Sequence, residues 1–270
     1  MAIITISRGS YSKGKEVAEK VASRLGYTCI SRDVLLDASE NFHVPEMKLV
    51  RAIHDAPSIL DRFSRSQQAF IAYIRCALVQ HVKEDNVVYH GLAGHLLLKG
   101  IPHVLKVRVI ADLHDRVRAE MKREKISDKA ARSLLLKDDE ERRKWTQSLY
   151  GVDPWDSALY DLVVHIRKLT VEDAVDIISD AAASAPFKTL KQTQQKMEDY
   201  GMACQLKASL VDSFDNVGVK SEYGNILVYA KGNEHHVQRV RKKAMEIAGK
   251  MTGVNELEVH AAQKLPPNTV

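Results

Sequence analysis

The sequence predicts an α/β protein: a first domain built on a mainly parallel sheet, followed by a small α+β domain. Three observations support this prediction. Strand and helix patterns alternate over residues 1–185, which is typical of parallel strands joined by helices. A glycine-rich turn joins the first strand pattern to the first helix pattern. Small residues and a proline interrupt the chain at residues 181–188, and an α-β-β-α-β order follows.

The composition is that of a folded protein with a mild positive charge. Of the 270 residues, 45% are hydrophobic, and the net charge is +5. This excludes general disorder, and the charge is too small to require nucleic acid as a partner. No apolar stretch approaches the ~20 residues of a membrane helix, so we expect no transmembrane segment. The three cysteines, Cys29, Cys76 and Cys204, are far apart, so we expect no disulfide framework, no metal site and a cytoplasmic protein.

The elements of the first domain follow from hydrophobic periodicity. Short β-branched runs predict strands at 2–6, 27–30, 86–89, 103–111 and 160–166. Apolar residues at helical spacing predict helices at 16–25, over much of 40–84, and at 171–183 with Thr170 as N-cap. Residues 112–144 are helical in pattern but rich in charge, which predicts two helices that stand off the core and join near Ser127.

The second domain has a different pattern. We expect a helix at 190–214, strands at 217–221 and 225–230, a basic amphipathic helix at 235–251 and a last strand at 256–260. The predicted division is therefore a first domain over 1–185, a linker over 186–194, a second domain over 195–264 and a frayed tail over 265–270.

The turn after the first strand carries the most informative motif. It reads Gly9-Ser-Tyr-Ser-Lys-Gly-Lys-Glu16, which matches the P-loop pattern except that Glu replaces the final Ser or Thr. Backbone N–H groups at a helix N-terminus bind phosphate, and a lysine adds positive charge. We expect the phosphate-binding residues to be Gly9, Ser12, Lys13, Gly14, Lys15 and Glu16. The simpler interpretation is a strand-to-helix turn with surface lysines.

The residues around this motif resemble a known family. Ile4-Thr-Ile-Ser-Arg-Gly-Ser-Tyr-Ser-Lys-Gly-Lys-Glu16 resembles the opening of the cytidylate kinase-like family, a branch of the P-loop nucleoside monophosphate kinases. Asp139-Glu-Glu-Arg142-Arg-Lys-Trp is similar to the family's lid, and Tyr160-Asp-Leu-Val-Val to its final strand. The resemblance covers about residues 2–183. It implies a three-layer α/β/α P-loop domain with a five-stranded parallel sheet, a helical lid, and phosphoryl transfer from ATP with Mg²⁺ to a nucleoside monophosphate.

The resemblance also implies roles for single residues. Lys15 and Arg142 would be the catalytic pair, with Arg142 stabilising charge on the transferring phosphoryl group. Arg116 would lie near the donor base or at the root of the lid. Arg32 and Asp33 occupy the place where such kinases begin their monophosphate site.

Two departures from the family pattern leave a second function open. Tyr11 and Lys13 replace loop glycines, and His90-Gly-Leu-Ala93 stands where the family usually has Gly-Arg-Gly-Ala. The alternative is therefore a catalytically weak or inactive nucleotide-sensing or scaffold protein.

The C-terminal segment is similar to a BON domain, a small α/β-sandwich used for binding. The similarity rests on the strand that ends at Gly232, the helix 235–251 and the ending Gly253-Val-Asn-Glu-Leu. It implies a protein or lipid partner, and the basic run 239–243 makes an anionic surface one option. The simpler interpretation of that run is a solvated helix face.

Overall fold

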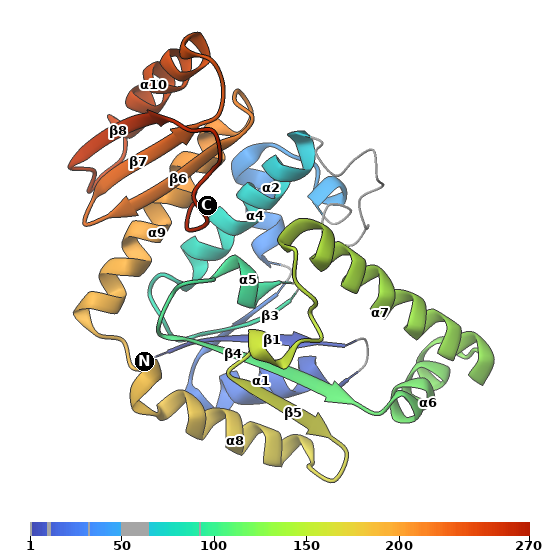
Figure 1. The fold of residues 1–270 in the computed structure, drawn as a ribbon. Coiled ribbons are helices and arrows are strands. Elements are labelled where there is room, and N and C mark those ends of the chain that lie inside the picture. The colour runs from blue at the N-terminus through green and yellow to red at the C-terminus, as the bar shows by residue number, and fades with distance from the viewer. Residues whose placement is uncertain (1, 10–11, 32, 50–64, 92) are drawn as a thin grey trace. The chain divides into compact units, whose positions relative to one another are not determined.

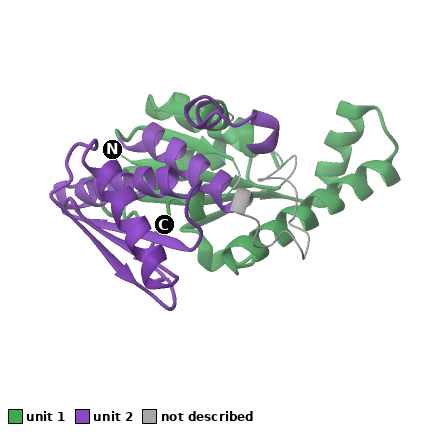
Figure 2. Cartoon of the chain, turned by 90° about the horizontal axis from the view of Figure 1, so that it is seen from above, with its two compact units in different colours: residues 1–36, 50–62, 84–189 green, residues 37–49, 63–83, 190–270 purple. Residues whose placement is uncertain are grey.

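The computed structural model describes residues 2–9, 12–31, 33–49, 65–91 and 93–270 (Figure 1). The chain forms two compact units that do not follow the order of the chain (Figure 2). Residues 37–49 and the helix α4 (Arg65–Val82) group with residues 190–270, and the rest of the described chain forms the other unit. A simple domain boundary near residue 185 stays a prediction.

The first unit is built on a five-stranded parallel sheet of order β2-β3-β1-β4-β5. The strands are β1 (Ile3–Arg8), β2 (Thr28–Ile30), β3 (Val87–His90), β4 (Val104–Ala111) and β5 (Leu162–Ile166). All five fall at the predicted places, and β5 begins two residues later than expected. Ile3, Ile4 and Ile6 of the central strand β1 are buried, as expected for a strand covered on both faces.

Two helices pack on this sheet and share its core. They are α1 (Gly14–Leu25) and α8 (Val171–Ala183). Lys20 forms an ion pair with Glu172, and Arg24 forms one with Asp176. The bounds of α8 are those predicted, because Thr170 accepts from the Asp173 amide and Asp173 accepts from the Thr170 amide in a capping box.

The charged segment forms a helical hairpin with a small core of its own. It consists of α6 (Leu113–Glu124) and α7 (Asp128–Tyr150). Val117, Ala131 and Leu135 are buried together between the two helices. Ser127 caps α7 by accepting from the Ala130 amide, which confirms the predicted junction.

Shorter elements of this unit are α5 (Gly94–Leu97) and two 3₁₀ turns at 157–159 and 185–187.

The second unit contains a three-stranded mixed sheet. Strands β6 (Val217–Glu222) and β7 (Asn225–Ala230) are antiparallel, and β8 (Glu256–Ala261) runs parallel to β7. The helices α9 (Lys191–Leu210) and α10 (Glu234–Ala248) bury apolar residues against it. The helix α2 (Asp33–Phe42) crosses from one unit to the other in sequence, and α4 packs on α9. Helical structure was expected over much of 40–84: α2 ends at Phe42, residues 46–49 are helical again, α4 covers Arg65–Val82, and residues 50–64 lie outside the described residues.

The tail of the chain is ordered, in contrast to the expected fraying. The Val270 amide donates to the carbonyl oxygen of Val219 at 3.0 Å, and Val270 packs against the core of the second unit. A Cβ atom at Gly218 would lie 2.6 Å from Thr269 Oγ1, so the glycine makes room for the tail. The packing of the partly buried Val270 and its pairing with Val219 of β6 explain the difference. Within the described residues, no helix is both long and apolar enough to span a membrane.

Asp199 of α9 holds the β6–β7 turn. The carboxylate is 5% exposed and accepts from the amides of Tyr223 and Gly224 at 2.8 and 2.9 Å, and from Ser221 Oγ at 3.1 Å. Tyr223 and Gly224 both have positive φ, at 51° and 76°, so the turn is costly without an acceptor.

We expect Asp199→Ala to lower the free energy of unfolding by about 3 kcal/mol, because it leaves buried amides without an acceptor. Urea denaturation followed by circular dichroism measures this difference. Asp199→Asn, which keeps one acceptor oxygen, is the matched control and should lose less. Equal stability of wild type and Asp199→Ala would contradict a role of this carboxylate in the turn.

Candidate active site

The loop between β1 and α1 is closed by its own hydrogen bonds. Ser12 Oγ donates to the carbonyl oxygen of Gly9 at 3.0 Å, and Ser12 is 1% exposed. Lys13 precedes α1 with a φ of 62°, a conformation for which glycine is usual. The first turn of α1 therefore begins at Gly14, directly after a tight left-handed residue.

Gly14 is required by the close approach of Arg8. A Cβ atom at Gly14 would lie 2.6 Å from Arg8 Cβ and 2.9 Å from Arg8 Cδ. These are distances that side-chain carbons do not tolerate. The backbone at Gly14, where α1 starts, thus packs against the side chain of Arg8 at the end of β1. This contact fixes the direction of the Arg8 side chain.

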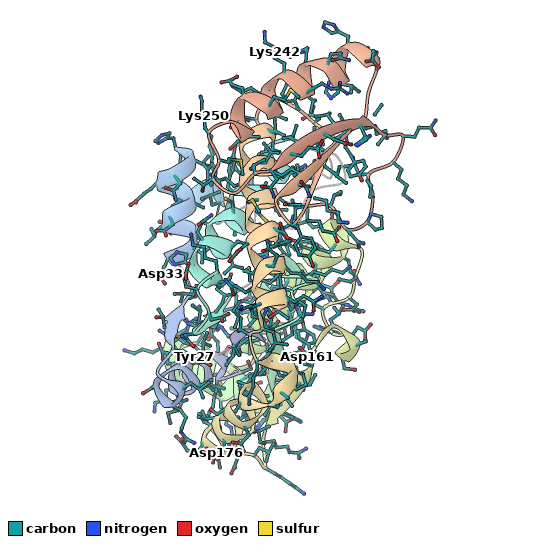
Figure 3. All side chains as sticks on the ribbon, turned by 90° about the vertical axis from the view of Figure 1, so that its left-hand side faces the viewer. Tyr27, Asp33, Asp161, Asp176, Lys242 and Lys250 are labelled. Carbon is teal, nitrogen blue, oxygen red and sulfur yellow. The ribbon has the colours of Figure 1, made fainter. Side chains whose placement is uncertain are left out.

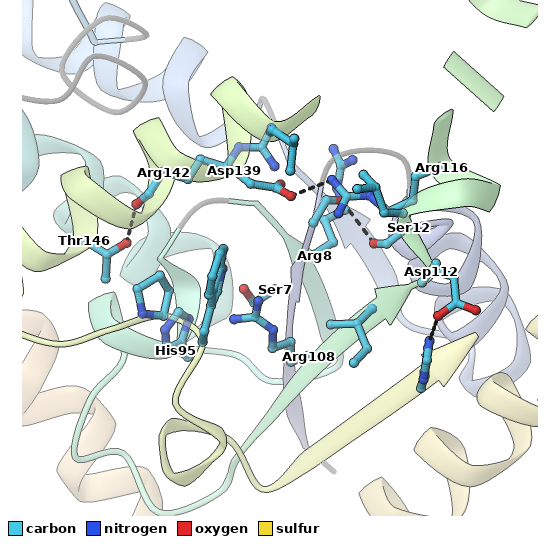
Figure 4. A pocket seen from close by; sticks show the side chains of 18 of the residues that line it. Ser7, Arg8, Ser12, His95, Arg108, Asp112, Arg116, Asp139, Arg142 and Thr146 are labelled. Atoms are coloured by element: carbon cyan, nitrogen blue, oxygen red, sulfur yellow. Dashed lines mark hydrogen bonds and ion pairs between the residues drawn. The ribbon is translucent and has the colours of Figure 1, made fainter. Parts of the chain in front are cut away.

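A cavity of about 430 Å³ lies at the carboxyl ends of the strands, beside this loop (Figure 4). Its wall includes Ser7 and Arg8 of β1, Arg108 of β4 and His165 of β5. The hairpin closes the cavity with residues of α6 and α7, among them Arg116, Asp139, Arg142 and Thr146. Ligands of open parallel α/β sheets bind at this edge.

The cavity is positively charged. Four arginines line it, each from a different element: Arg8, Arg108, Arg116 and Arg142. Arg116 Nη2 pairs with Asp139 at 2.8 Å. No other described residue forms an ion pair with Arg108 or Arg142, and both side chains are half-buried. Two unpaired guanidinium groups in a shared cavity favour an anionic ligand with more than one charge.

Asp112 is the second carboxylate of the cavity. Its Oδ1 lies 3.0 Å from His165 Nε2, and its Oδ2 lies 3.0 Å from Arg167 Nε. Both carboxylates of the cavity are therefore engaged with basic groups, Asp139 with Arg116 and Asp112 with His165 and Arg167.

Three residues that line the cavity, His95, Arg108 and Pro154, meet at Tyr160 in a polar network. The Tyr160 hydroxyl donates to the carbonyl oxygen of Pro154 at 3.0 Å and lies 3.3 Å from His95 Nε2. Arg108 Nη1 donates to the hydroxyl oxygen of Tyr160 at 3.4 Å. Burial, and then the nearby Arg108, lower the pKa of His95 to about 3, so the imidazole is neutral. Burial also raises the pKa of Tyr160.

The neutral state of His95 predicts a pH dependence of stability. In the unfolded chain a histidine takes up a proton below about pH 6.5, whereas native His95 does so only near pH 3. The stability that depends on neutral His95 is therefore fully present above pH 6.5 and is lost as the pH falls towards 3. Over this range the free energy of unfolding falls by up to about 1.4 kcal/mol per pH unit. Urea denaturation at pH 7 and pH 4.5 should show a smaller loss for His95→Gln than for wild type. An equal loss would contradict the burial of a neutral imidazole.

The structure brings together four of the residues expected from the sequence. Gly9, Ser12, Arg116 and Arg142 line the cavity. Arg116 lies at the loop, since its Cζ is 3.6 Å from the place of a Cβ at Gly9. Gly14 lies behind the loop, against Arg8.

The other expected residues lie elsewhere. Lys13 and Glu16 line a second, open hollow of about 570 Å³ between α1, α6 and the segment after β5. The Lys15 side chain is 65% exposed, pairs with Glu19 at 3.6 Å, and lines neither hollow. Asp33 is exposed at the start of α2, where its Oδ2 accepts from the Ser31 amide at 3.1 Å. Arg32 lies outside the described residues.

Sequence reasoning missed Arg8, Arg108 and the network of His95 and Tyr160. Arg108 had a signal: buried parallel strands read as continuous apolar runs, whereas β4 carries two charged residues, Lys106 and Arg108, within its apolar run. Tyr160 had none, because its contacts join residues far apart in the chain.

Two known proteins are similar to this chain in sequence. The chain is 33% identical over 101 residues to the cytidylate kinase of Methanosarcina acetivorans, a match that covers 36% of this chain and 54% of that protein. It is 24% identical over 176 residues to the cytidylate kinase of Sulfolobus acidocaldarius, covering 65% of this chain and 91% of that protein. For the first of these relatives the chain spans about half the length.

A solved structure shows the same fold. It is an uncharacterized protein from Eubacterium ventriosum, 22% identical, with a TM-score of 0.52, and the match covers 68% of this chain and 100% of that one. The profile of the cytidylate kinase-like family matches residues 3–168, more than half of the chain. With the parallel sheet, the loop and the arginine-lined cavity, this match shows that the chain belongs to the cytidylate kinase-like family.

Proposed function

We propose that the protein transfers a phosphoryl group from ATP to a nucleoside monophosphate of the cytidylate type. The observation that carries the proposal is the cavity beside the loop, in which Arg108 and Arg142 have no ion-pair partner among the described residues. Membership of the cytidylate kinase-like family supports the same activity. Positioning and charge neutralisation supply most of the catalysis in such a reaction.

The described residues take different roles according to where they lie. Arg142 of α7 faces the cavity from the hairpin and stabilises charge on the transferring group. Arg116 is fixed by Asp139 beside Gly9, next to the backbone of the loop. Lys13 and Glu16, in the second hollow, border the space available to the rest of the donor nucleotide.

The residues present fit Mg²⁺ bound together with phosphates. Among the described residues no group of three His, Cys, Asp or Glu side chains could hold a metal alone. Mg²⁺ in phosphoryl-transfer sites uses one or two carboxylates, waters and the substrate phosphates. Asp112 and Asp139 are the carboxylates at the cavity, and either would contact Mg²⁺ by giving up its basic partner, His165 and Arg167 for Asp112 or Arg116 for Asp139. When bound, Mg²⁺ neutralises charge on the phosphates.

Turnover of the full chain with ATP, Mg²⁺ and a panel of nucleoside monophosphates tests the proposal. We expect nucleoside diphosphate formation, fastest with a pyrimidine monophosphate. Tight ATP binding by calorimetry with no turnover of any monophosphate would contradict it and favour the nucleotide-sensing alternative. No ATP binding at all would favour a scaffold.

Lys15 provides a separate prediction. Because its side chain is exposed and pairs with Glu19, we expect Lys15→Ala to change kcat/KM by less than about fivefold, as for an exposed ion pair. Steady-state kinetics with ATP as the varied substrate measures this. A loss of about 10² or more would instead assign Lys15 the catalytic role that the motif predicts.

For the C-terminal segment we propose a BON-like binding module over residues 195–264 with a protein or anionic-lipid partner. Lys242 is exposed on α10 (Figure 3). Arg239 of the same helix is also exposed, whereas Arg241 donates to the carbonyl oxygen of Val259. Liposome flotation with anionic vesicles tests the lipid partner. Binding that is lost in Arg239→Glu/Lys242→Glu would support it, and binding unchanged by the double variant would contradict it. The expected cytoplasmic location stays a prediction.

A further inference from the structure

Arg108 is an unusual residue for its place in the fold. It stands in β4, between Val107 and Val109, which are both fully buried. Its guanidinium group donates to Tyr160 Oη at 3.4 Å and lies 5.6 Å from the centre of the Tyr160 ring. Tyr160 is neutral, so this packing orients the charge of Arg108 without cancelling it.

Neither of the described carboxylates that line the cavity forms an ion pair with Arg108. Asp139 is paired with Arg116, and Asp112 contacts His165 and Arg167. His95, which also borders Tyr160, is neutral. Asp153 acts electrostatically on Arg108 but is itself paired with Arg143 at 2.6 Å. A half-buried guanidinium group without an ion pair of its own has lost hydration with little counter-charge in return. An anionic ligand in the cavity would restore that balance.

The position of Arg108 distinguishes it from Arg142. Arg108 comes from β4 of the sheet, whereas Arg142 comes from α7 of the hairpin (Figure 4). Tyr160, which contacts Arg108, also lies 3.4 Å from Ser7 Oγ. Two cations on separate elements fit two anionic groups that meet in the cavity. Directly after β3, where the family usually has an arginine, this chain has Gly91, whereas Arg108 of β4 brings a positive charge to the cavity.

We propose that Arg108 binds the phosphate of the acceptor and so selects monophosphates over the corresponding nucleosides, and that Tyr160 is its positioning residue. This inference rests on the proposed function. The bidentate geometry of a guanidinium group suits a phosphate, and its fixed direction places the acceptor for in-line attack. Lysine, a point charge on a flexible stem, replaces it only in part.

Kinetics of the full chain with CMP and ATP as varied substrates tests the role. We expect Arg108→Gln to raise the KM for CMP by about 30- to 100-fold and to leave the KM for ATP within about twofold. Arg108→Lys should be intermediate, and Tyr160→Phe should raise only the KM for CMP, by about three- to tenfold. Arg132→Gln, an exposed arginine of α7, is the control of equal charge change. Equal effects on both KM values would overturn the proposal.

Calorimetric titration without ATP separates this inference from the proposed function. CMP should bind wild type more tightly than cytidine does, and Arg108→Gln should remove that difference. This result would support the Arg108 site even if wild type turned over no monophosphate, which alone would reject the proposed function. The same affinity of wild type and Arg108→Gln for CMP, or no binding of CMP by wild type, would overturn the inference.

Discussion

Arg142→Gln should lower kcat for phosphoryl transfer by about 10³, with a much smaller change in either KM. The guanidinium group reaches the cavity from α7, is half-buried, and has no ion-pair partner among the described residues. Its charge is therefore available to oxygens whose negative charge grows during transfer, and an interaction of that kind appears in kcat. Steady-state and single-turnover kinetics measure the loss.

Arg132→Gln is the matched control for this prediction. Arg132 is an exposed arginine of the same helix, outside the lining of the cavity, so its replacement changes the net charge equally. We expect its kcat to stay within about twofold of wild type. Similar losses in the two variants would show that the charge of the hairpin, and not the position of Arg142, determines the rate.

Gly14→Ala should lower kcat/KM by about 10² or more. The added Cβ would meet Arg8 Cβ at 2.6 Å, and neither this atom nor the backbone of α1 is the free end of a flexible side chain. Relief of the clash requires a shift of the loop or of Arg8, and a displacement of about 1 Å in a positioning site costs on the order of 10²-fold.

Stability and activity must be separated in this variant. Overpacking of this kind costs about 1–3 kcal/mol, so thermal denaturation should show a protein that remains folded at the assay temperature. Gly201→Ala in α9 is the control glycine, because the nearest atom to its Cβ, Val79 Cγ1, lies at an ordinary 3.5 Å. Wild-type activity of Gly14→Ala would contradict the close packing of loop and strand.

Much of the fold could be predicted because its signals are local. Capping by Thr170 and Ser127 defined the start of α8 and the junction of the hairpin. Apolar β-branched runs defined the five strands of the first sheet. The grouping of α4 with α9 and the pairing of Val270 with Val219 depend on contacts between distant segments, which periodicity does not contain.

The site could be predicted only in part for the same reason. The motif pointed to Gly9 and Ser12, and the family spacing to Arg116 and Arg142, all of which line the cavity. The Lys15 side chain is exposed and pairs with Glu19, four residues later on the same helix. The motif alone does not predict this contact. Arg108 is identified as a site residue by its place in the cavity and by its contact with Tyr160, 52 residues away in the chain, and the sequence contains neither.

The central claim is that the arginine-lined cavity transfers a phosphoryl group from ATP to a monophosphate. The most direct test is transfer of label from γ-³²P-ATP by the full chain in the presence of CMP and Mg²⁺. We predict labelled CDP from wild type and a rate about 10³ lower from Arg142→Gln. Label found only in inorganic phosphate, or CDP formed equally fast by Arg142→Gln, would contradict the claim.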